Sequence, residues 1–119
     1  MDNLRHNQSF ISTKDIEETR VYGPDGKEIS VIDHLMIDRV SGKIVYAVIK
    51  LGGVVVIAAG YYPVPWSLFS FEAGLDGFRA KLNENQLREG PQLSESSWND
   101  REWERTVHDY YAVQPYWDR

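Results

Sequence analysis

The sequence predicts a mainly β protein, a small sandwich or barrel of five or six short strands. Three observations favour this fold class. Short runs of alternating apolar and polar residues recur along the chain, and turn signals rich in Gly, Pro and Asp separate them. The length of 119 residues suits one ordinary domain and is too short for two. We therefore expect a single core with an extension at each end.

Residues 1–18 are expected to form an N-terminal arm that ends in a short helical turn. Ser12 precedes Asp15 by three positions, which is a weak capping box for a turn running to Glu18. Residues 19–93 are expected to form the barrel, beginning with a β-prone run over residues 19–22. The following Gly-Pro-Asp-Gly sequence, residues 23–26, predicts a reversal because Pro fixes one φ and Gly accepts a positive one.

Residues 28–38 and 43–51 are predicted to pair as a β-hairpin. In the first run the apolar residues recur at every second position, except where Asp33 intervenes. The second run is rich in β-branched residues, and Gly42 between the runs supplies the positive φ of the turn. One face of this hairpin is expected to point inward.

Residues 51–71 contain no charged side chain and approach the length of a membrane-spanning helix. Three glycines within the stretch lower helix propensity by about 1 kcal/mol each, and Pro63 and Pro65 cost about 3 kcal/mol each in a helix interior. We therefore expect no membrane span. The stretch is instead divided into a buried strand over residues 54–59, a corner bounded by the two prolines and a strand over residues 66–72.

The remaining predicted elements are short. Residues 78–82 alternate apolar with basic residues, as in a half-exposed strand, and residues 83–88 suit one helical turn before Gly90-Pro91. Residues 94–119 form an acidic, aromatic extension. Asn99 is expected to cap a helix that runs to about Ala112, with Glu102 at the third helical position.

The order of motifs from Arg20 to Leu93 resembles the PRC-barrel domain. This family is named for the cytoplasmic part of the photosynthetic reaction-centre H subunit and includes the C-terminal half of the small-subunit ribosome maturation factor. The matching segments are VYGPDGKEI, IDHLMIDRVSGKIVYAVIK, a double glycine and VPW. The family-motif residues within them are Asp38, Gly42, Gly52, Gly53, Pro65 and Trp66. One departure is the segment VVVIAAG, where such proteins often carry further glycines and aromatics.

The resemblance implies a six-stranded antiparallel barrel that acts as an interaction module, with no catalytic residues. The residues themselves also disfavour an enzyme. The chain has no Cys, no His spacing typical of a metal site and no glycine-rich phosphate loop, so we expect no metal and no cofactor. Asp33-His34 and His108-Asp109 are adjacent acid and imidazole pairs, as a general base requires. Neighbours on a strand point to opposite faces, so Asp33 is not expected to orient His34, and both pairs are interpreted as solvated polar positions, one on a strand and one on the C-terminal helix.

Charge predicts protein partners better than nucleic acid. The net charge is −5, and the last 26 residues hold six acids against three bases. Arg79 and Lys81 on a predicted strand are the one feature that favours RNA, but such a pair is far more often a solvated sheet face, and the acidity of the chain disfavours RNA binding. The N-terminus lacks the pattern of a secretory signal and the chain lacks cysteine, so a cytoplasmic protein is expected.

The C-terminal extension supplies the candidate interaction surface. It comprises Trp98, Trp103, Tyr110, Tyr111, Tyr116 and Trp117. These rings either fold back on their own barrel or pack on a second copy in a homodimer. The leading hypothesis is a non-catalytic, self-associating interaction module that docks on a larger assembly. The alternatives are an accessory factor in ribosome maturation or RNA processing, and an assembly factor at an electron-transfer membrane complex.

Overall fold

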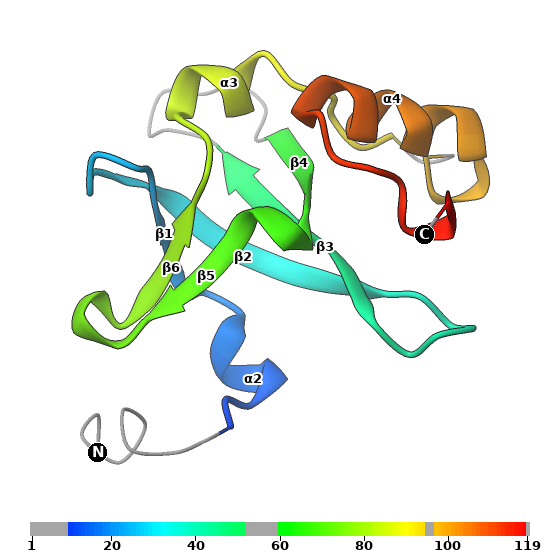
Figure 1. The fold of residues 1–119 in the computed structure, drawn as a ribbon. Coiled ribbons are helices and arrows are strands. Elements are labelled where there is room, and N and C mark those ends of the chain that lie inside the picture. The colour runs from blue at the N-terminus through cyan, green and yellow to red at the C-terminus, as the bar shows by residue number, and fades with distance from the viewer. Residues whose placement is uncertain (1–9, 52–59, 95–96, 119) are drawn as a thin grey trace.

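The computed structural model describes residues 10–51, 60–94 and 97–118, and these form a curved six-stranded sheet with short helices at its margins (Figure 1). The strands are β1 (Arg20–Tyr22), β2 (Glu28–Ile37), β3 (Ile44–Leu51), β4 (Gly60–Pro65), β5 (Phe69–Glu72) and β6 (Gly77–Ala80). Their order across the sheet is β4-β3-β2-β1-β6-β5. The mainly β fold class and the number of strands agree with the sequence prediction.

One strand pair differs from the purely antiparallel arrangement that was expected. β1 and β6 run parallel, with Val21 opposite Phe78, whereas the other neighbouring pairs are antiparallel. The direction of β6 is set by its tight antiparallel pairing with β5. β6 of this hairpin pairs with the side of β1 that faces away from β2, and these two strands run parallel. The sheet therefore contains both parallel and antiparallel pairs.

The β2–β3 hairpin confirms the prediction for its turn. Gly42 has φ +76, and its N–H donates to the Asp38 carbonyl at 2.8 Å, while the Asp38 N–H donates to the Lys43 carbonyl at 2.8 Å. A side chain at position 42 would be strained at this φ, since only glycine adopts it freely. The strand ladder on both sides of the turn follows the expected pairing of residues 31–37 with residues 44–50.

The prolines lie in a strand, not in the predicted corner. β4 pairs antiparallel with β3, placing Pro63 opposite Val48 and Pro65 opposite Tyr46. β4 is at the edge of the sheet, where a missing backbone donor need not interrupt a ladder on both sides. The strand expected over residues 66–72 also begins later, because Trp66–Leu68 form a 3-10 turn before β5. The strand expected over residues 54–59 lies outside the described residues.

Three short α-helices accompany the sheet, all within the described part of the chain. α2 (Thr13–Ile16) is capped by Ser12, and α3 (Glu84–Arg88) has a capping box between Asn83 and Gln86. α2 ends two residues before the predicted Glu18. α4 (Arg101–Tyr111) is capped by Asp100, not by the predicted Asn99. Asn99 is instead the last residue of a 3-10 turn, Ser97–Asn99, that leads into the helix.

The core lies between the curved sheet and the C-terminal extension. Ile32, Ile49 and Val64 are at most 1% exposed on the sheet, and Val107 of α4 is fully buried with them. α4 packs against β4, and the chain then returns along the helix to the C-terminus (Figure 1). The extension is thus part of the barrel's own core. No helix in residues 10–51, 60–94 and 97–118 is long and apolar enough to cross a membrane.

Candidate functional site

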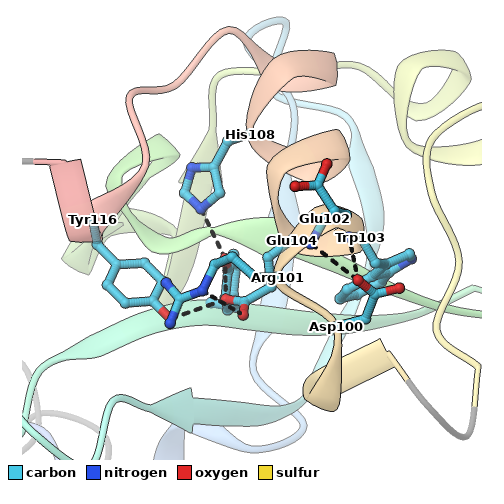
Figure 2. Close-up of polar contacts among 8 residues, drawn as sticks. Asp100, Arg101, Glu102, Trp103, Glu104, His108 and Tyr116 are labelled. Atoms are coloured by element: carbon cyan, nitrogen blue, oxygen red, sulfur yellow. Dashed lines mark hydrogen bonds and ion pairs between the residues drawn. The ribbon is translucent and has the colours of Figure 1, made fainter.

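A buried hydrogen-bond network joins the barrel to its C-terminal extension. The Tyr46 hydroxyl, on β3, donates to Glu104 Oε1 at 2.9 Å and lies 2.8 Å from His108 Nε2. The Tyr116 hydroxyl donates to the same Glu104 oxygen at 2.9 Å. Figure 2 shows Glu104 and His108 side by side on α4, with Tyr116 closing the network from the other side. We call these four residues the tail network.

Local sequence explains why these side chains meet. Glu104 and His108 are four positions apart on α4 and so lie on one face of the helix. The helix ends at Ala112, whose left-handed conformation (φ 55) turns the chain back. The Val113 carbonyl then lies 3.2 Å from His108 Nδ1, and Tyr116 follows in a 3-10 turn, Tyr116–Asp118. The reversal places Tyr116 over Glu104.

The electrostatics of the network favour neutral phenols. Burial, followed by the Glu104 carboxylate, raises the pKa of Tyr46 well above its ordinary value. Burial and the hydrogen bond to Glu104 raise the pKa of Tyr116 to about 12. Both phenols therefore stay protonated and donate to the carboxylate near neutral pH. His108 is only 2% exposed, so its ring is held inside the fold.

A groove of about 420 Å³ opens beside the network, between the β2–β3 turn and the C-terminal extension. It is lined by Asp38, Val40, Ser41, Lys43, Ile44, Val45, Arg101, Tyr116 and Trp117. A smaller hollow of about 110 Å³ reaches from it towards Pro65 and Trp66, sharing Ile44, Val45 and Tyr116. One wall is therefore the hairpin and the other is the tail that the network fixes in place.

Two arginines of α4 stack on the Trp117 ring, and one of them, Arg101, lines the groove. The Arg101 guanidinium carbon lies 4.1 Å from the centroid of the Trp117 ring, and that of Arg105 lies 5.5 Å from it. Such stacking holds a guanidinium over an aromatic face while leaving N–H groups free to bind an anion. On the opposite wall, hydrogen bonds from Ser41 lower the pKa of Asp38, so that carboxylate stays charged within its own turn.

Comparison with known proteins assigns the fold to a family. The model of the PRC-barrel domain matches residues 9–86. The chain belongs to the PRC-barrel family. A solved structure similar to this PRC barrel is that of a candidate 16S ribosomal RNA processing protein, RimM, from Pseudomonas aeruginosa, with 17% identity and a TM-score of 0.42. The match covers 68% of this chain and 49% of that chain, so the chain spans about half the length of that protein. No curated protein matches the chain.

Three of the family-motif residues line the groove or the adjoining hollow, Asp38 the groove and Pro65 and Trp66 the hollow. Asp38 and Gly42 form the β2–β3 turn, and Pro65 ends β4. Trp66 is half-buried and stacks on Phe69 with ring centroids 5.5 Å apart, so most of its surface serves packing. The remaining two motif positions, Gly52 and Gly53, lie outside the described residues.

The aromatic residues of the tail divide between the core and the surface. Trp98 and Tyr116 contact the Tyr46 ring at 5.3 and 6.1 Å, and Trp103 contacts Trp98 at 5.2 Å. These contacts are made to the chain's own barrel, as in the first of the two alternatives. The extension does not form one continuous aromatic surface.

The other three aromatic residues of the C-terminal extension, Tyr110, Tyr111 and Trp117, also differ in burial. Tyr111 is buried, whereas Tyr110 is 40% exposed and donates to the Gln86 carbonyl at 2.6 Å. Trp117 is half-buried at the groove, with its ring 5.4 Å from that of His108. Of the six rings Tyr110 is thus the most exposed and Tyr111 is buried, while the other four are half-buried, and Tyr116 and Trp117 among them line the groove.

Sequence reasoning misjudged the Asp33–His34 pair. His34 Nδ1 lies 2.7 Å from Asp33 Oδ2, although neighbours on a regular strand would point apart. The ladder between β2 and β3 shifts register between Ile32 and His34, and this bulge turns the two side chains together. Both side chains remain about one-third exposed, which makes the pair a surface contact.

Of the residues at the centre of the site other than Tyr116, the sequence singled out only His108, beside Asp109. The prediction that His108 is a solvated position on the tail helix was wrong, because its ring packs inside the fold against Tyr46. Tyr46 sits inside an apolar strand, where a buried Tyr is expected only if its hydroxyl finds a partner. Glu104 and His108 carried the one usable signal, an acid and an imidazole at helical spacing on an otherwise apolar face. No sequence signal indicated Arg101, because the chain reversal at Ala112 is what brings the Trp117 ring against it.

The basic pair that favoured RNA is largely committed to the fold. Arg79 pairs with Glu72 at 2.8 Å and donates to the carbonyls of Gly23 and Pro24. Only Lys81 is left exposed on that strand. Among the described residues no group of three or more His, Cys, Asp or Glu is placed to hold a metal ion.

Proposed function

We propose that this PRC-barrel chain is a non-catalytic protein-interaction module that docks on a larger assembly in the cytoplasm. The docking surface, called here the hairpin–tail face, comprises Ile37, Val40, Lys43, Arg101 and Trp117. The observation that carries the proposal is the exposure of apolar side chains at the hairpin tip, where Val40, which lines the groove, is 96% exposed and Ile37, the last residue of β2, is 53% exposed. Apolar side chains clustered at a hollow are typical of protein contacts.

The site's chemistry supports docking more than catalysis. Its titratable core is buried and already hydrogen-bonded, and its exposed groups are an aliphatic tip, two arginines and an indole. Arg and Trp are enriched among the residues that dominate binding energy at interfaces. The tail network would hold these groups in a fixed arrangement before a partner arrives, which lowers the entropic cost of association.

Affinity purification with mass spectrometry tests the proposal. Wild-type chain is expected to recover a defined partner that Val40→Asp does not, because a carboxylate at the tip would be desolvated on docking. Phe10→Asp is the matched control, since Phe10 is also highly exposed but lies at the N-terminal end of the described chain. A partner recovered equally by wild type and Val40→Asp would show that the hairpin–tail face is not the docking surface.

Self-association through the same face is part of the proposal. An apolar hairpin tip beside a hollow can pair with its own copy across a two-fold axis, giving the expected homodimer. Light scattering on wild type should give twice the chain mass, and Val40→Asp should shift it towards the monomer. A monomeric wild type at high concentration would remove self-association while leaving docking on another protein open to the purification test.

A second candidate is an accessory role in ribosome maturation, supported by family membership because one branch of the PRC-barrel family has that role. It predicts that the chain co-sediments with small ribosomal subunits. If it does so, Val40→Asp should again weaken the association while Phe10→Asp should not. Sedimentation of the chain at the top of the gradient, apart from the subunits, would count against this candidate.

A further inference from the structure

We propose that the groove of the hairpin–tail face binds a linear segment of a partner protein in which an Asp or Glu lies beside an aliphatic or aromatic residue. This inference rests on the proposed function and specifies the chemistry of the partner. The groove combines an apolar floor with cations on its walls, and each of these features selects one part of such a segment.

The floor supplies the apolar part of the recognition. Ile44 and Val45 of β3 are half-buried there, with Trp117 as the facing wall and Val40 at the open end. The volume of about 420 Å³ is within the range of small ligand sites, and the adjoining hollow extends it along the strand towards Trp66. An extended peptide can therefore place one or two apolar side chains along this floor.

The walls supply the cations. Arg101 Nε lies 3.9 Å from Glu104 Oε2, which is longer than a hydrogen bond, and the side chain is 52% exposed. The other Glu104 oxygen already accepts from two phenols. Lys43 is exposed on the hairpin wall and, within the described residues, forms no ion pair. Both cations therefore have donors available for an incoming carboxylate.

One carboxylate, that of Asp38, lines the groove together with the cations, and hydrogen bonds from Ser41, followed by the Arg101 charge, lower its pKa. Asp38 accepts the Ser41 N–H at 2.9 Å and serves the hairpin turn. Arg105 lies four residues after Arg101 with its guanidinium over the same Trp117 ring, and it forms an ion pair with Asp118 at 3.8 Å. The cations that line the groove and face an incoming carboxylate are therefore Lys43 and Arg101.

The net charge of the chain favours a peptide over a nucleic acid as the molecule bound in the groove. With a net charge of −5, the chain repels a polyanion at a distance, whereas one or two carboxylates feel mainly the nearby cations. The wall cations are also too few for the extended phosphate contacts that dominate nucleic-acid affinity. A short acidic and apolar segment fits both the local and the overall charge.

Selection of peptides from a random phage-displayed library on the folded full-length chain tests this inference. Enriched peptides are expected to carry Asp or Glu next to Leu, Ile, Phe or Trp. Binding of a synthetic consensus peptide should weaken by about tenfold or more in Lys43→Glu/Arg101→Glu, because two attractive charges become repulsive. Glu at position 101 suits the first turn of α4, so the variant is expected to fold, and denaturant unfolding is to be measured in parallel.

The matched control is Lys81→Glu/Arg88→Glu, which makes the same charge change at residues that do not line the groove. It should bind the consensus peptide within about twofold of wild type, since exposed charges far from a site are screened by salt. Enrichment of peptides without acidic residues, no enrichment, or equal binding by the groove variant would each overturn the inference. So would binding of polyuridylic acid that the groove variant abolishes. Partner recovery that depends on Val40 would then still stand as support for docking.

Discussion

The Tyr46 hydroxyl lies between Glu104 and His108, 2.9 Å from Glu104 Oε1 and 2.8 Å from His108 Nε2. We predict that Tyr46→Phe lowers the free energy of unfolding by about 1–3 kcal/mol, because it removes a donor from a buried carboxylate without changing the ring. Denaturant unfolding followed by tryptophan fluorescence measures this loss. Trp98 and Tyr116 should still pack against the phenyl ring, so the fold is expected to persist.

Tyr61→Phe is the control for that substitution. Tyr61 is 38% exposed, and its hydroxyl makes no hydrogen bond within the described residues, so its loss should change stability by less than about 0.5 kcal/mol. Equal effects at positions 46 and 61 would mean that the tail network contributes no stability.

Ala112 carries backbone strain at the end of α4. Its φ of 55 is in the left-handed region, which costs a non-glycine residue about 1–2 kcal/mol. Ala112→Gly is therefore predicted to raise the free energy of unfolding by about 1 kcal/mol. Ala73→Gly, at an exposed position without a positive φ, should instead lower it. Destabilisation by both substitutions would argue against the left-handed cap.

At the residue scale, the sequence predicted what depends on near neighbours. Gly42 needed a positive φ because a hairpin turn requires one, and Ser12 capped a helix as its chemistry indicates. The Asp33–His34 contact was missed because it depends on a bulge, which is set by how two strands share a register and not by local preference.

At the element scale, α4 begins one residue later than Asn99 would place it. Asp100 Oδ1 accepts the N–H groups of Glu102 and Trp103 at 3.0 and 3.3 Å. Asp100→Ala is predicted to destabilise the fold by about 1 kcal/mol, whereas Asn99→Ala should be close to neutral. Thermal unfolding of the two variants shows which residue caps the helix. A larger loss of stability for Asn99→Ala than for Asp100→Ala would contradict the structure.

β4 shows why a strand with two prolines is difficult to recognise. Proline disfavours a central strand but is tolerated at a sheet edge, and the sequence does not state which strand will be the edge. The β2–β3 hairpin posed no such problem, because its alternation, its glycine and its short connection all favour the same structure. Local agreement of this kind made the hairpin, the short helical turn over residues 83–88 and the fold class predictable.

At the scale of the whole molecule, the tail network predicts loss of stability at high pH. Tyr116 has its pKa raised from an ordinary value of about 10 to about 12, and the pKa of Tyr46 is raised as well. A raised pKa means that the fold binds the phenolic proton more tightly than the unfolded chain does. The resulting stabilisation is complete below about pH 10 and is lost as pH rises towards the folded pKa values.

Urea unfolding at intervals from about pH 8 to about pH 11 measures this dependence. Stability should be level at first and then fall with pH, and Tyr46→Phe should reduce the slope because it removes one of the titrating phenols. A wild-type slope equal to that of Tyr46→Phe above about pH 10 would show that the Tyr46 hydroxyl is not held neutral by the fold.

The main question that the sequence left open was whether the aromatic side chains of the C-terminal extension pack on their own barrel or on a second copy. Burying an indole releases the same free energy whether it packs on its own barrel or on a second copy, so composition does not distinguish the two. The reversal at Ala112 and the hydrogen bonds of Glu104 place the rings on the chain's own barrel, and the bond from Tyr46 to Glu104 joins residues far apart in the sequence. The groove and its wall cations follow from that placement.

The central claim is therefore that each tail completes its own barrel and forms one wall of its own groove. An isotope-filtered NOESY experiment on an equal mixture of labelled and unlabelled chains tests it most directly. The account predicts that contacts from the Tyr46 ring to Trp98 and Tyr116, with ring centroids 5.3 and 6.1 Å apart, arise within one chain and vanish from the inter-chain spectrum. The same contacts appearing between labelled and unlabelled chains would show that the tail is exchanged and would contradict the account.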